Sequence, residues 1–202
     1  MPNAPGQGSS ISPVGRQDSI ESARVSIERA SVPDSKPRHG AFGISIRSAL
    51  GPEEYPRLVA VWRSAVDATH DFLAAEHREE IESHLASDYF PQVALFVAVR
   101  GGVPVGFAGV AEGNLEMLFV DAAARGTGVG SALLSFVIAG HGVRTVDVNE
   151  QNAQAVGFYR SRGFRVTCRS ELDDQGRPYP LVHMAVPGAA ATVDAGAPRT
   201  RV

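Results

Sequence analysis

The 202-residue sequence contains a single cysteine, Cys168, so no intrachain disulfide can form and nothing points to an oxidising compartment. No apolar run approaches the length that spans a membrane. Residues 1–15 lack the basic and apolar segments of a signal peptide. The formal net charge of −3 supplies no basic field that would attract nucleic acid or an anionic membrane surface. We therefore expect a cytoplasmic protein with no nucleic-acid or membrane partner.

Metal-binding spacings are also missing. The sequence has six histidines and many carboxylates, but no H-E-x-x-H pair and no paired cysteines. We therefore expect no metal.

The two ends of the sequence differ in composition from its middle. Residues 1–40 are rich in Ser, Pro, Gly and small polar residues, which predicts a disordered N-terminal extension. Residues 187–202 are poor in large apolar residues and are predicted to form a flexible tail. The remaining residues, 41–186, have the usual length of one domain.

The periodicity within 41–186 predicts alternating blocks of helices and strands. A short strand (43–47) precedes a helix that begins at Pro52 and a second helix over 74–90. Three strands then follow, with tight turns at Gly101-Gly102 and Gly113-Asn114. The rest is predicted as a helix (131–140), a strand (143–148), a helix (153–163) and two strands (164–171 and 181–186). This order predicts an α/β fold with a mixed, mostly antiparallel sheet and flanking helices.

The stretch DAAARGTGVG (121–130) places three glycines at alternate positions before a helix. It could be a structural turn. A dinucleotide fingerprint would need a sixth-position glycine, where Ser131 stands, and a P-loop would need a Lys-Ser or Lys-Thr pair. The third interpretation is Arg-x-x-Gly-x-Gly, in which bare backbone amides at a helix N-terminus and the Arg125 side chain bind a pyrophosphate.

The motif RGTGVG (125–130) resembles the acetyl-coenzyme A signature of the GNAT (Gcn5-related N-acetyltransferase) superfamily. DVNEQNAQAVGFYRSRGF (147–164) resembles the next strand, asparagine loop and Tyr-x-x-x-Gly-Phe helix end of that family. Residues 61–73 and 170–184 are similar to the YjaB-type branch of bacterial N-acetyltransferases. The resemblance implies a GNAT fold, acetyl-CoA as acyl donor and an amine acceptor, either a protein lysine or a small molecule. Homodimers are common in the superfamily.

The resemblance also implies a set of coenzyme-binding residues. The strand edge would supply the oxyanion donor and pair with the pantetheine arm. The asparagines would bind pantetheine, although Asn152 also stands where the next helix needs an N-cap. The implied residues are Leu118, Phe119, Val120, Arg125, Gly126, Thr127, Gly128, Val129, Gly130, Ser131, Asn149, Asn152 and Phe158.

Tyr159 and Glu116 match the catalytic positions of the family. Tyr159 would protonate the leaving thiolate, and its alternative is a core tyrosine with one polar end. Glu116 would be the base, and its alternative is a solvated or salt-bridged glutamate. Strand alternation predicts that Glu116 shares a face with Leu118 and Val120.

The acceptor pocket is expected to form from residues outside the motifs, with His70 and Glu171 as rival bases. Ser64 and Asp67 are further candidates for its lining, and Trp62 could equally be a core residue. The residues assigned to the acceptor are His70, Asp71, Trp62, Glu171 and Tyr179.

No histidine adjoins Cys168, which is predicted to be a buried structural thiol, so direct transfer is favoured over an acyl-cysteine route. A non-catalytic acyl-CoA-binding sensor is the alternative function. Lys36 is the only lysine. The scarcity of lysine reflects either a coding bias towards arginine or the avoidance of lysines that an acylating enzyme would modify on itself.

Overall fold

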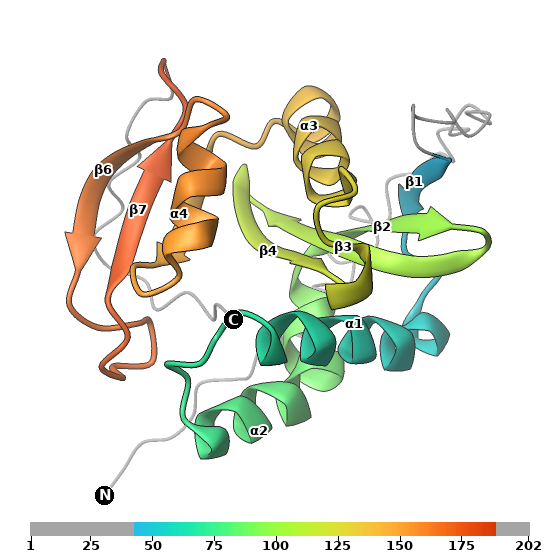
Figure 1. Cartoon of the computed structure of the whole chain (residues 1–202), viewed down its shortest axis with the longest axis horizontal. Helices are drawn as coiled ribbons and strands as arrows, with labels where there is room; N and C mark the ends of the chain where they lie inside the picture. The colour runs from blue at the N-terminus through green and yellow to red at the C-terminus, as the bar shows by residue number, and fades with distance from the viewer. Residues whose placement is uncertain (1–42, 189–202) are drawn as a thin grey trace, which may run out of the picture. The chain divides into compact units, whose positions relative to one another are not determined.

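A computed structural model describes residues 43–188 (Figure 1). The predicted extension 1–40 and most of the predicted tail 187–202 lie outside the described residues. The helices are α1 (Tyr55–Asp67), α2 (Ala75–His84), α3 (Val129–His141) and α4 (Ala153–Arg160). The strands are β1 (Ile44–Ser48), β2 (Ala94–Arg100), β3 (Val103–Ala111), β4 (Asn114–Val120), β5 (Thr145–Asn149), β6 (Arg165–Ser170) and β7 (Leu181–Ala185).

The strands form one sheet in the order β1-β2-β3-β4-β5-β7-β6. All neighbouring pairs are antiparallel except β4 and β5, which are parallel. This mixed, mostly antiparallel sheet with helices beside it confirms the predicted fold class. β7 lies between β5 and β6, so the last strand of the described residues is an inner strand and β6 is an edge.

Two apolar clusters pack on opposite faces of the sheet. One contains Leu133 and Leu134 of α3 and Tyr159 of α4, together with inward residues of β4, β5 and β7. The other contains Leu58 and Trp62 of α1 with residues of β2 and β3. Figure 1 shows α1 and α2 on the side of the sheet away from α3. The alternating pattern of the strands therefore divides the core between two helical layers.

The chain is helical through most of the predicted helix 74–90, but it changes from α-helix to a π-helical turn over Leu85–Tyr89, where Leu85 and Tyr89 are buried beside α1. One local prediction is wrong. Cys168, predicted to be buried, is exposed. It lies on the edge strand β6, whose residues are almost all exposed, so this strand has no buried face that would cover a thiol.

The parallel pair β4–β5 is very short and creates an opening in the sheet. Its registered partners are Asn114 with Thr145 and Leu115 with Val146, and the strands separate beyond them. Backbone amides and carbonyls of β4 that point towards β5 therefore have no strand partner past Leu115. None of the helices described is long and apolar enough to cross a bilayer.

Candidate active site

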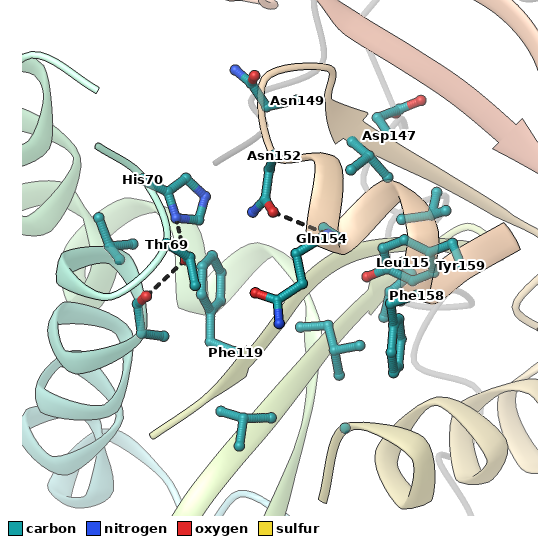
Figure 2. Close-up of a pocket in the computed structure, with 18 of the residues that line it drawn as sticks. Thr69, His70, Leu115, Phe119, Asp147, Asn149, Asn152, Gln154, Phe158 and Tyr159 are labelled. Atoms are coloured by element: carbon teal, nitrogen blue, oxygen red, sulfur yellow. Dashed lines mark hydrogen bonds between the residues drawn. The ribbon is translucent and has the colours of Figure 1, made fainter. Parts of the chain in front are cut away.

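A cavity of about 790 Å³ occupies the opening between β4 and β5 (Figure 2). Its walls come from α1 and the loop after it, from β4, from the glycine loop, from α4 and from the loop between β6 and β7. Figure 2 shows Thr69 and His70 on one side of this space, and Phe158 and Tyr159 on the other. The cavity thus joins residues that are widely separated in the sequence.

The glycine loop forms one wall, at the N-terminus of α3. Gly128 is the N-cap of α3 with φ +89°, and Gly126 has φ +73°, conformations that side-chain-bearing residues rarely adopt. A Cβ added to Gly126 would meet nothing within 4 Å, so close packing does not explain this glycine. The loop presents bare backbone amides beside the positive end of α3, an arrangement that suits a phosphate group.

Arg125 and Thr127 anchor the glycine loop to different parts of the fold. Arg125 donates to the Ala68 carbonyl at 3.3 Å and to the Gln154 side chain, so it connects the end of α1 with α4. Thr127 donates to the Ala124 carbonyl at 2.6 Å and accepts from Arg100 at 2.7 Å. Unlike its neighbours, Thr127 does not line the cavity.

Arg162 is a basic group of this wall that the sequence analysis missed. Its guanidinium lies 3.7 Å from the centre of the Phe158 ring and donates to the Ser131 hydroxyl. The cation therefore stacks on an aromatic face beside the first turn of α3. The Tyr-x-x-x-Gly-Phe helix end contains Arg162, but only the folded chain brings it to Ser131.

Tyr159 lies at the base of the cavity in a largely apolar setting. Its side chain is buried, and its ring packs edge-on against Phe158 and Phe164. Burial raises the pKa of the Tyr159 hydroxyl well above its ordinary value, and the nearby Arg162 opposes this only in part. The phenol is therefore protonated at neutral pH and can donate a proton.

Glu116 lines the cavity and lies at an irregularity of β4. Met117 pairs with Gly109 and Leu115 pairs with Val110, so Glu116 is the extra residue of a β-bulge. Its Oε1 accepts from the Asn114 side chain at 2.9 Å. Leu118 and Val120 pack against the apolar cluster that contains the α3 residues. The bulge interrupts the alternation between Leu115 and Met117, so the face of Glu116 does not follow from alternation alone.

His70 lies opposite, after the end of α1. Thr69 donates its only hydroxyl proton to the Ala65 carbonyl at 2.8 Å and lies 2.7 Å from His70 Nδ1, so Nδ1 must donate to Thr69. Burial lowers the pKa of His70 to about 4, with a further contribution from the positive charge of Arg125. The imidazole is therefore neutral at pH 7, with Nε2 as an acceptor. Figure 2 shows this second nitrogen directed into the cavity.

The loop between β6 and β7 closes the far side of the cavity. The Tyr179 hydroxyl accepts from the Ala74 amide at 3.1 Å and lies 2.7 Å from His77 Nδ1. Arg177 forms an ion pair with Glu80 at 2.7 Å. This loop is therefore fastened to α2 by side-chain contacts, and Tyr179 lines the space between them.

Both asparagines line the cavity and have structural hydrogen bonds as well. Asn152 caps α4 by accepting from the Ala155 amide at 3.0 Å. Asn149, at the end of β5, accepts from the Gln151 amide at 2.8 Å. The capping alternative for Asn152 is therefore observed, and its position on the cavity leaves its amide group within reach of a ligand.

Several predicted acceptor residues are not brought to the cavity. Asp71 does not line it. Glu171 is 81% exposed and pairs with Arg169. Ser64 hydrogen bonds to Asp121, and Asp67 bonds to Arg78. Trp62 lines the cavity but is 1% exposed, so it is also a core residue.

Comparison with known proteins identifies the family. Residues 63–186 match the acetyltransferase (GNAT) domain family. The chain belongs to the GNAT family. It is 48% identical to the peptidyl-lysine N-acetyltransferase YjaB of Escherichia coli over 72% of this chain and 99% of that protein. It is 47% identical to YjaB of Salmonella typhimurium over 67% of this chain and 93% of that protein.

A solved GNAT structure supports the same assignment. The solution structure of apo YjaB from Escherichia coli aligns with a TM-score of 0.66 over 72% of this chain and 99% of that chain, at 48% identity. The chain is therefore an N-acetyltransferase, as the resemblance of RGTGVG and of residues 147–164 implied. Within residues 43–188, no group of three or more His, Cys, Asp or Glu side chains could hold a metal ion.

Proposed function

We propose that this GNAT protein transfers the acetyl group of acetyl-CoA directly to the side-chain amine of a protein lysine. One observation supports this most: a single cavity runs from the glycine loop, past Tyr159, to His70 and Tyr179. Donor and acceptor sites that meet in one space favour a ternary complex without a covalent enzyme intermediate. The lysine acceptor is suggested by the relatives named peptidyl-lysine N-acetyltransferase.

The residues that line the cavity fit acetyl-CoA as the acyl donor. The amides of Gly126–Ser131 and the guanidinium of Arg125 would hold the pyrophosphate of the coenzyme. The β4 edge past Leu115 offers backbone groups for the pantetheine arm and one amide donor for the developing oxyanion. Bound acetyl-CoA would supply the activated thioester.

The chain's own groups would manage the protons. A lysine ammonium, with pKa about 10.4, must lose a proton before its nitrogen can attack. Glu116 is the proposed base, and the neutral His70, whose Nε2 faces the cavity, remains its rival. Tyr159 is kept protonated by burial and would donate to the departing thiolate.

The test is CoA-thiol release by the full-length protein with acetyl-CoA and a panel of lysine peptides, N-terminal amines, polyamines and amino acids. We expect release that depends on a lysine side chain, and mass spectrometry should find acetyl-lysine in the peptide. Tight acetyl-CoA binding with no release on any amine would contradict the proposal and support the sensor alternative. Release only with small amines would retain the enzyme but remove the protein substrate.

A further inference from the structure

Three side chains on neighbouring strands form a hydrogen-bonded series that ends at the cavity. His183 on β7 has Nδ1 2.5 Å from Oδ1 of Asp147 on β5 and Nε2 2.8 Å from Oγ of Ser170 on β6. A carboxylate can only accept, so His183 Nδ1 donates to Asp147. The three side chains thus form one series, in the order Asp147, His183, Ser170.

The arrangement resembles the triad of a serine hydrolase, but its position argues against a nucleophilic serine. Of the three side chains, Asp147 alone lines the cavity. Ser170 ends the edge strand β6, away from the acetyl-transfer space. Asp147 is therefore the member of the series that borders the cavity.

Asp147 and Glu116 occupy equivalent positions on facing strands. The parallel pairing of β4 with β5 ends at Leu115 and Val146, and the next residues along the strands are Glu116 and Asp147. Val146 and Val148 point into the α3 cluster, so alternation places Asp147 on the opposite face. Figure 2 shows Asp147 on β5, across the cavity from His70. Glu116 and Asp147 therefore both lie where the two strands begin to separate, and both residues line the cavity.

The reaction removes two protons from the acceptor nitrogen. An ammonium carries three hydrogens and the amide product carries one, so two protons leave the nitrogen as the N–C bond forms and the C–S bond breaks. One proton is balanced by the proton that Tyr159 donates to sulfur, and the other is released. One carboxylate can hold only one of them at a time.

We propose that Asp147, positioned by His183 and Ser170, is a second catalytic carboxylate that takes one of the two protons from the acceptor amine. The inference rests on the proposed N-acetyltransferase function. Since His183 binds Oδ1, it fixes the orientation of the carboxylate. Asp147 holds a negative charge next to the incoming ammonium, takes a proton from it, and returns that proton to solvent when the product leaves. His183 and Ser170 are positioning residues.

The experiment measures kcat and KM for a lysine peptide, together with acetyl-CoA binding by calorimetry. We expect Asp147→Asn to lower kcat about 10²-fold, within the usual range for a general base, with unchanged affinity for acetyl-CoA. Asp147→Glu should recover part of the activity. His183→Gln should lower kcat less, and should have no further effect in the Asp147→Asn background, because it acts through that carboxylate.

The outcomes separate this inference from the function on which it rests. Wild-type protein without amine-dependent thiol release would overturn both. An active wild type with an equally active Asp147→Asn variant would overturn only the role of Asp147. Additive losses for His183→Gln and Asp147→Asn would overturn the positioning by His183. An acetylated Ser170 that forms during turnover would overturn the scheme in favour of a covalent route.

Discussion

The hydroxyl of Tyr179 lies 2.7 Å from Nδ1 of His77, joining two residues that are 102 positions apart in the sequence. This contact and the Ala74 amide bond fasten the β6–β7 loop to α2 over the acceptor side of the cavity. The shape of the acceptor pocket therefore depends on a side-chain contact that neither segment shows in its own sequence pattern.

Removal of that hydroxyl should weaken acceptor binding. In Tyr179→Phe the Ala74 amide loses its partner, so we expect a loss of about 1–2 kcal/mol in the free energy of unfolding and a several-fold higher KM for the lysine peptide. The affinity for acetyl-CoA should not change. Tyr55→Phe is the matched control, because Tyr55 packs against Phe90 at the start of α1 and does not line the cavity. Equal KM values in the two variants would contradict the role of the loop.

Tyr159→Phe should separate binding from turnover. The variant keeps the ring that packs on Phe158 and Phe164, so it should fold and bind acetyl-CoA normally. Without the proton donor, kcat should fall about 10²–10⁴-fold in the thiol-release assay. Wild-type kcat in this variant would remove Tyr159 as the acid.

Burial of the same tyrosine also predicts a pH dependence. The pKa of Tyr159 is raised above the ordinary tyrosine value of about 10, so its hydroxyl stays protonated in the alkaline range. We expect kcat at saturating substrates to show no decline between about pH 8 and pH 10 from loss of this proton. A descending limb in this interval that is absent from Tyr159→Phe would contradict the prediction.

His70 should make the fold sensitive to acid. Its pKa is about 4 in the folded protein, against an ordinary value of 6.5. As the pH falls from about 6.5 to 4, the unfolded chain binds a proton that the folded chain rejects, so stability is lost across this window. The full difference corresponds to about 3 kcal/mol.

Urea unfolding at pH 7 and pH 4.5 measures this effect. The decrease in the free energy of unfolding between the two pH values should be smaller by about 2–3 kcal/mol in His70→Gln than in the wild type. His84→Gln, on the exposed side of α2, is the control and should behave like the wild type. An identical decrease in all three proteins would show that His70 carries no such penalty.

Substitution by alanine should change the free energy of unfolding in opposite directions at Gly106 of β3, which packs against α3, and at Gly140 of α3. A Cβ at Gly106 of β3 would lie 3.0 Å from the Phe119 carbonyl oxygen and 3.0 Å from Val129 Cγ1, so Gly106→Ala should destabilise the protein by about 1–3 kcal/mol. Gly140, in the exposed last turn of α3, has nothing within 4 Å. Gly140→Ala should stabilise by about 0.4–1 kcal/mol. Unfolding free energies that change in the same direction would contradict the close packing of β3 on α3.

Local patterns in the sequence predicted most of the fold. The Gly101-Gly102 and Gly113-Asn114 turns divide three strands, and their periodicity assigned the meander correctly. Two features depend on long-range packing and could not be predicted. The insertion of β7 between β5 and β6 has no local sequence signature, and neither has the change from α-helix to π-helix at Leu85.

The candidate site also contains residues that local sequence patterns indicate and others that they do not. The glycine loop, Asn149, Asn152 and Tyr159 belong to contiguous motifs, so the sequence indicated them, and they line the cavity. The bulge at Glu116 adds a residue to β4 without altering the apolar pattern, so the sequence did not indicate this irregularity.

Asp147 and Arg162, which the sequence did not indicate, have partners that are distant in the sequence. Asp147 meets His183 and Ser170 only after β5, β7 and β6 assemble. Arg162 likewise meets Ser131 through the packing of α4 beside α3.

The two-residue pairing of β4 with β5 has a consequence for how the domain opens. The backbone ladder that carries cooperativity through a sheet is at its weakest where Asn114 and Leu115 meet Thr145 and Val146. The meander β1–β4 and the β5–β7 unit should therefore exchange their amide hydrogens as two separate groups. A coenzyme bound to both groups would couple their opening. Donor binding should therefore slow hydrogen exchange also in strands that the coenzyme does not contact.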